Sequence, residues 1–402
     1  MTVATARPGL LLVTACYQGF TLSDGALRML VLLHLHAAGM SPWALVLVLL
    51  PYEIAGVFTN LLSGWLGARF GLKSTMLAGL ALQVVACALL TLDVVWLTVP
   101  FVMGTQLLSG IAKDLAKTAA KSYVATLAPA SQTGHGMFRL VAWLTGSKNA
   151  MKGCGFFAGG ALLAAAGFRG TNLGLAVLLS VLLLLAAWLL PGSPHKAKAT
   201  LRAVVAQTPP VRWLALARLF LFASRDAWFV VALPLFLATT LGWSSPWVGG
   251  FLSVWVIGYG AVQAMTPRFV RPAATAAGAT TTLVATAALL LPLGASAVAL
   301  HAGLAPAATV VVGLCAYGVV FAITSSLHSW LVLAIAGGND VVERVGFYYA
   351  ANSVGRLGGT VLSGAMFATF GEGVAGLVAC LWASLGLVVL ASVSTIPVRA
   401  RN

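Results

Sequence analysis

Long runs of apolar residues, separated by short polar stretches, follow one another along the whole chain. Each run is close to the roughly 20 residues that an α-helix needs to cross a lipid bilayer. The pattern therefore predicts an all-α membrane protein with twelve transmembrane helices. They are expected at about residues 10–36, 43–67, 74–93, 98–121, 135–164, 171–190, 211–239, 246–266, 273–293, 306–335, 344–369 and 374–396.

A longer polar stretch divides the predicted helices six and six. Residues 191–210 are rich in proline and polar side chains, and we expect them to form a cytoplasmic linker. This linker would join an N-terminal half, residues 1–190, to a C-terminal half, residues 211–402.

The two halves resemble each other at an offset of about 203 residues. Asp24 and its neighbours match Asp226 and its neighbours, and Asn149 matches Asn352 in the same way. Two six-helix halves in parallel repeat are typical of the major facilitator fold. Residues 64–73, between the second and third predicted helices, also resemble the loop signature of that superfamily.

The composition supports a membrane protein and excludes other classes. Of 402 residues, 60% are hydrophobic and 8% charged, and the mean hydropathy is +0.99, unlike a soluble enzyme. The net charge of +15 does not indicate nucleic-acid binding, because the basic residues are scattered among apolar runs. The five cysteines lie in apolar segments without metal-ligand spacing, so we expect neither a metal site nor a cofactor.

The basic residues outside the apolar runs predict the orientation of the chain. They gather on the side of the bilayer that also holds both chain ends, whereas the other side holds only Arg169. Cytoplasmic loops of membrane proteins carry the excess of Lys and Arg. Both termini of this multi-pass chain are therefore predicted to be cytoplasmic.

The fourth predicted helix ends in an unusual run of lysines. Lys113, Lys117 and Lys121 recur every four residues and share one helix face, with Asp114 as the acid beside them. A charge at the centre of a bilayer costs about 2.5–3.5 kcal/mol on insertion scales. The pattern therefore predicts a water-filled cavity that binds an anion. The alternative is a cytoplasmic helix end whose lysines reach outward to water, which suits Lys121 best.

Other charges lie within the predicted helices, and basic residues outnumber acidic ones. The basic set is Arg28, Lys113, Lys117, Lys121, Arg139, Lys148, Lys152, Arg218, Arg225 and Arg356, and the acids are Asp24, Glu53, Asp114 and Asp226. Asp24 and Arg28 are four residues apart on one helix face and can pair. Arg225 and Asp226 are adjacent, so each is expected to need a partner elsewhere. Each charge could instead belong to an ion pair that fixes helix register.

Four acids cannot neutralise this many cations, so the surplus favours a site for a small molecule with several negative charges. Arginine suits bidentate binding of phosphate, arsenate or carboxylate groups. The predicted substrate-binding residues are Arg28, Lys113, Lys117, Lys148, Lys152, Arg225, Arg356, Asn149, Asn352 and Tyr348. The candidates for proton coupling are Asp24, Glu53 and Asp226, with Asp226 favoured. Arg139, Arg218 and Lys121 are expected near the cytoplasmic face.

Several long strings resemble a known family. Residues 21–30, 52–60, 109–114, 144–149 and 225–234 are similar to the ArsJ-type organoarsenical efflux permeases, which are major facilitators of the bacterial inner membrane. The resemblance implies export of 1-arseno-3-phosphoglycerate, the unstable ester made when glyceraldehyde-3-phosphate dehydrogenase uses arsenate in place of phosphate. It also implies a functional link to that dehydrogenase. We expect the transporter to be a monomer in the lipid bilayer.

Two other functions are alternatives to this one. An organophosphate or phosphate exchanger would need a similar cationic site. A membrane enzyme, or a receptor for anionic lipid, is disfavoured because the sequence shows no nucleophile–base pair, metal cluster or phosphate-binding GxxxxGK[ST] loop. The chain is therefore predicted to be a transporter and not an enzyme.

Overall fold

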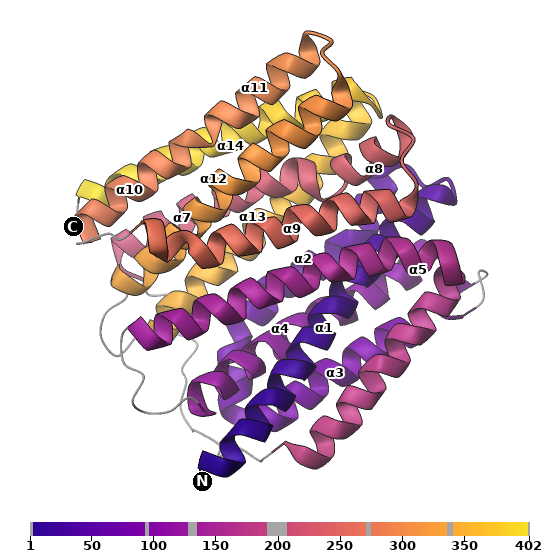
Figure 1. Ribbon diagram of the computed structural model, residues 1–402, viewed down its shortest axis with the longest axis vertical. Coiled ribbons are helices and arrows are strands. Elements are labelled where there is room, and N and C mark those ends of the chain that lie inside the picture. The colour runs from indigo at the N-terminus through magenta and orange to yellow at the C-terminus, as the bar shows by residue number, and fades with distance from the viewer. Residues whose placement is uncertain are drawn as a thin grey trace.

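The computed structural model describes residues 3–92, 96–127, 135–190, 207–270, 275–335 and 341–400, and this part of the chain is helical without a β-strand (Figure 1). The helices are α1 (Val3–Ala37), α2 (Pro42–Phe70), α3 (Leu72–Leu89), α4 (Val99–Leu127), α5 (His135–Leu189), α7 (Pro209–Phe229), α8 (Ala232–Thr239), α9 (Ser245–Phe269), α10 (Thr275–Ala288), α11 (Leu290–His301), α12 (Pro306–Ile335), α13 (Val341–Thr369) and α14 (Val374–Ala400).

Eight segments of the described chain are long and apolar enough to cross a membrane. Their length and composition make this a multi-pass membrane protein, although the number of twelve crossings stays a prediction. Helices α1, α4 and α13 are not among the eight. Charged side chains interrupt the apolar runs of these three helices: Asp24 and Arg28 are buried in α1, Asp114 is buried in α4, and Arg356 is partly buried in α13.

The fifth and sixth predicted helices are continuous with each other in α5. The chain reverses at Gly167, whose backbone has φ 70° and ψ 180°. A positive φ is strained for residues with a Cβ atom, and glycine adopts it freely. The turn at Gly167 therefore lies between the predicted spans 135–164 and 171–190, and the connection between the two helices is very short.

The helices form two groups that touch mainly along two helix pairs. In the first group α1 packs against α5, and α4 packs against α2 and α3. In the second, α7 packs against α13 and α14, and α12 packs against α9 and α10. The groups meet where α5 contacts α9 and α2 contacts α13. In Figure 1 the indigo-to-magenta helices lie on one side and most of the pink-to-yellow helices on the other. The predicted linker lies mostly outside the described residues, so the domain boundaries stay predictions.

Glycines allow the closest helix contacts, as their spacing in the sequence indicates. A methyl group on Gly155 would overlap the carbonyl oxygen of Leu22 on α1. A methyl group on Gly355 would overlap the carbonyl oxygen of Leu219 on α7 in the same way. Small residues let two backbones approach closely. These contacts hold α5 against α1 and α13 against α7, and so set which charged side chains can reach each other.

Candidate functional site: a buried ion cluster between the two helix groups

Asp24 on α1 is held by partners from two other helices. The hydroxyl of Tyr52 on α2 donates a hydrogen bond to Asp24 Oδ1 at 2.5 Å. Lys152 Nζ on α5 lies 3.6 Å from Asp24 Oδ2. The possible ion pair between Asp24 and Arg28 does not form, and Arg28 pairs with Glu53 instead. Although the two residues share a helix face, the close contact of α1 with α5 gives Asp24 a basic partner across the helices.

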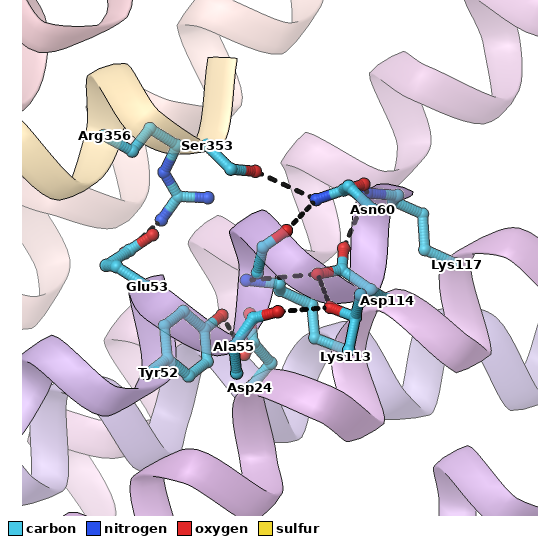
Figure 2. A network of polar contacts seen from close by, with 12 residues as sticks. Asp24, Tyr52, Glu53, Ala55, Asn60, Lys113, Asp114, Lys117, Ser353 and Arg356 are labelled. Carbon is cyan, nitrogen blue, oxygen red and sulfur yellow. Dashed lines mark hydrogen bonds and ion pairs between the residues drawn. The ribbon is translucent and has the colours of Figure 1, made fainter. Parts of the chain in front are cut away.

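Glu53 and Asp226 are joined through a single arginine. Arg356 on α13 donates to Glu53 Oε1 at 2.7 Å and to Asp226 Oδ2 at 3.2 Å. Arg28 also donates to Glu53 Oε1, at 3.0 Å. The pair of Glu53 with Arg356 links α2 to α13 and therefore crosses the contact between the two helix groups (Figure 2).

Arg225 and Asp226 pair directly with each other. Arg225 Nε and NH2 both lie 2.6 Å from Asp226 Oδ1. Each residue was expected to need a partner elsewhere, which holds for Asp226 with Arg356, whereas Arg225 pairs with its own neighbour. Adjacent residues leave a helix about 100° apart, but the long arginine side chain folds back and reaches the carboxylate. Asp226 thus has one basic partner on its own helix and one on α13.

Asp114 on α4 binds both of its neighbouring lysines. Lys117 Nζ lies 2.7 Å from Asp114 Oδ1, and Lys113 Nζ lies 4.0 Å from Oδ2. Lys113 also sits over the ring of Tyr52, 4.0 Å from its centroid. Lys113 therefore reaches Asp114, although its ion pair is long. Of the two lysines it is the more weakly held.

A second polar link joins α2 to α13. Asn60 on α2 donates to the hydroxyl of Ser353 at 2.9 Å and accepts from Lys117 Nζ at 2.5 Å. Figure 2 shows this contact beside the pair of Glu53 and Arg356. The side chain of Asn60 thereby connects Lys117 on α4 to α13, the helix that carries Arg356.

The repeat of the sequence is visible in the ion pairs. Asp24 on α1 pairs with Lys152 on α5, and its repeat counterpart Asp226 on α7 pairs with Arg356 on α13. Both pairs join helices that are brought together by glycines. In each helix group, a close helix contact at glycines thus brings one acid and one base together.

The cluster contains more basic than acidic groups. Six basic residues, Arg28, Lys113, Lys117, Lys152, Arg225 and Arg356, share four acids, Asp24, Glu53, Asp114 and Asp226. The acids are 0–6% exposed, whereas five of the basic side chains, all but Arg28, are 15–20% exposed. The partly exposed groups of the cluster are therefore basic, whereas its four carboxylates are buried in the protein.

That open space is narrower than the predicted water-filled cavity. The gap beside the cluster is lined by Asp24, Leu27, Arg28, Leu49, Tyr52, Gln106 and Ser109 and has no room even for a water molecule. Sites for small molecules commonly have volumes of about 300–1,000 Å³. The acids lie between the cations and hold them together, so a ligand would have to part some of these ion pairs on entering.

Arg218 on α7 is buried, which corrects the expectation that it reaches the cytoplasmic face. It is 4% exposed and donates to the Asn352 side chain and to Ser325. The ring of Tyr348 lies 5.2 Å from its guanidinium carbon. Asn352 and Tyr348, both predicted substrate ligands, thus gather around an arginine that the sequence reasoning set aside. Its spacing could have identified it, because Arg218 lies two helical turns before Arg225, on the same face.

The remaining predicted site residues lie on α5. Asn149 donates to the side chain of Gln263 on α9 at 2.9 Å, so it forms part of the contact between the helix groups. Lys148 is partly buried and lies one turn from Lys152 on the same face. The side chains of Lys121 and Arg139 lie outside the part of the structure that is described.

Comparison with known proteins gives a family but no individual relative. No curated protein matches the chain. The family model of the Major Facilitator Superfamily matches residues 10–336, which is most of the chain and extends from α1 into the end of α12. Together with the all-helical, multi-pass structure, this match shows that the chain belongs to the Major Facilitator Superfamily, a family of secondary transporters.

Proposed function

We propose that this transporter exports an anionic organoarsenical, 1-arseno-3-phosphoglycerate, by alternating access and in exchange for protons. The observation that carries the proposal is the surplus of basic over acidic side chains where the two helix groups meet. In alternating access, one half of a transporter rocks against the other around a central site. A cationic cluster in that place supports an anionic substrate.

The ion pairs suggest how the substrate would bind. Arg356 and Arg225 hold carboxylates that a phosphate or arsenate group could replace, since these oxyanions accept the same paired N–H donors. Removing one partner from a buried ion pair without replacement costs about 3–5 kcal/mol. A polyanionic substrate would offset this cost, because it supplies new partners while the old pairs open.

The choice of an arsenical rests on the resemblance to the ArsJ-type permeases. It further suggests a monomer in the bacterial inner membrane with both termini cytoplasmic, working beside glyceraldehyde-3-phosphate dehydrogenase. The ester carries an arsenate group and a phosphate group, and so several negative charges at neutral pH. An inside-negative membrane potential would drive its exit, by about 2.3 kcal/mol per charge per 100 mV.

Resistance of cells to arsenate tests the proposal. Cells that lack their own arsenic exporters should become resistant when they express this chain together with the dehydrogenase. The dehydrogenase alone should give no resistance, because nothing then exports the ester, and the transporter alone should give less than the pair, because it depends on the ester that the cell's own dehydrogenase makes. No resistance from the pair would contradict the proposal. Uptake of labelled glycerol 3-phosphate by vesicles that contain the protein would favour an organophosphate exchanger instead.

A further inference from the structure

Arg218 is a buried cation without an acidic partner among the described residues. Its Nε donates to Asn352 Oδ1 at 3.1 Å, and its NH1 donates to the carbonyl and hydroxyl oxygens of Ser325, both at 3.2 Å. These acceptors are neutral. Every acid of the ion cluster pairs with another base. Burying an ion costs several kcal/mol unless an opposite charge compensates it.

The surroundings of Arg218 hold further unsatisfied polar atoms. His328 lies one turn after Ser325 on α12, so the two residues share a helix face. It is fully buried, and neither ring nitrogen has a hydrogen-bond partner in the described structure. Buried polar groups are normally hydrogen-bonded. A buried cation with only neutral acceptors and an unpartnered imidazole on adjoining helices both favour a site for an anionic ligand here.

Phe222 places Arg218 close to the ion cluster. The guanidinium carbon of Arg218 lies 4.1 Å from the centroid of the Phe222 ring, and that of Arg225 lies 4.8 Å from it. The two guanidinium groups are therefore at most about 9 Å apart. A small molecule with an anionic group at each end could span such a separation.

We propose that Arg218 binds the second anionic group of a substrate that carries two, while the ion cluster around Arg225 and Arg356 binds the first. This inference rests on the proposed function, in which the substrate carries two anionic groups, and adds which side chain binds the second of them. The two anionic groups of the substrate would then meet different binding sites. The first must displace Glu53 or Asp226, whereas the second meets a cation that has no carboxylate to give up.

This arrangement predicts selectivity. A doubly anionic ligand should bind much more tightly than a matched ligand with one anionic group, because only the former compensates the charge of Arg218. Hydrogen bonds to charged groups contribute more than neutral ones, and leaving a buried charged donor unsatisfied is expensive. We expect a preference of at least about tenfold, which corresponds to about 1.4 kcal/mol.

The test uses two stable anions that differ in one charged group. 3-Phosphoglycerate carries a phosphate and a carboxylate, whereas glycerol 3-phosphate carries the phosphate alone. Their dissociation constants would be measured by calorimetry on the purified full-length protein. The wild-type protein should prefer 3-phosphoglycerate at least tenfold. In Arg218→Gln the preference should fall below about threefold, through weaker binding of 3-phosphoglycerate, with glycerol 3-phosphate nearly unaffected.

Asn352→Asp provides a second variant that keeps the arginine. It places a carboxylate where Arg218 now meets a neutral amide, and so supplies an internal counterion. Binding of 3-phosphoglycerate should weaken as in Arg218→Gln, while thermal stability should be unchanged or higher. If Arg218 only supports the fold, Asn352→Asp should leave the preference intact, and that result would overturn the inference.

The outcomes also separate this inference from the proposed function. If the wild-type protein binds both anions but Arg218→Gln keeps the tenfold preference, the assignment of Arg218 is wrong and anion transport stands. Equal weakening of both anions in Arg218→Gln would also overturn the assignment. If the wild-type protein binds neither anion, both the anion transport and the role of Arg218 are wrong.

Discussion

Replacing Arg356 with alanine should lower transport at least about a hundredfold while the protein still folds. Arg356 joins Glu53 of one helix group to Asp226 of the other. Without it each acid keeps another partner, Arg28 for Glu53 and Arg225 for Asp226, so no carboxylate is left buried and unpaired. What is lost is the ionic link across the contact of α2 with α13 and one cation for the substrate. A hundredfold loss corresponds to about 2.7 kcal/mol in the barrier.

Initial rates of substrate uptake by vesicles, normalised to the amount of protein in the membrane, measure this effect. Arg268→Ala is the matched control, because Arg268 is an exposed arginine at the end of α9, and it should transport normally. Arg356→Lys keeps the charge but cannot bridge two carboxylates with a planar group, so it should fall between alanine and the wild type. Near-normal transport by well-expressed Arg356→Ala would show that the link is dispensable.

Replacing Asp226 with asparagine should uncouple transport from the pH gradient. Asp226 is fully buried and binds Arg225 and Arg356, the two arginines that a substrate anion would occupy. When the anion takes these arginines, Asp226 loses its basic partners and a proton becomes the natural replacement. Asparagine cannot take up that proton, so the variant should bind substrate but ignore an imposed gradient.

Everted vesicles with an acidic interior test in which direction the pH gradient drives substrate transport. Their interior corresponds to the outside of the cell, so protons leaving the vesicle would accompany substrate entering it. One pH unit is worth about 1.4 kcal/mol per proton, so wild-type accumulation should rise up to about tenfold. Asp226→Asn should show no rise, whereas Glu372→Gln, which changes an exposed acid, should respond like the wild type. A well-expressed Asp226→Asn protein that still follows the gradient would remove Asp226 from the coupling step.

The helices and their closest contacts could be predicted from the sequence because both depend on local patterns. Apolar runs indicate helices that cross the membrane, and glycines spaced along α5 and α13 indicate close packing. The repeat relation of Asp24 with Asp226 likewise predicted the matching positions of the two acids. The apolar pattern does not show the break between α7 and α8 or the break between α10 and α11. Pro234 and Pro292 lie in the first turn after these breaks, and proline lacks the N–H that would continue the helical hydrogen bonds.

The partners of each charge could not be predicted in this way. The spacing allows Asp24 to pair with Arg28 on its own helix, but the contact of α1 with α5 brings Lys152 to it. Sequence spacing describes neighbours on one helix, whereas these pairs depend on how different helices approach each other. Arg218 was misjudged for a similar reason, because its distance from the helix end says nothing of the side chains from α12 and α13 that cover it.

Uptake of arsenic by everted vesicles tests the central claim most directly. Vesicles with and without the protein would be incubated with arsenate, with or without the dehydrogenase, glyceraldehyde 3-phosphate and NAD that produce the arsenate ester. We predict that arsenic accumulates in vesicles that contain the protein, and only while the ester is being formed. Equal accumulation from arsenate alone, or none while the ester is forming, would contradict export of the anionic arsenical.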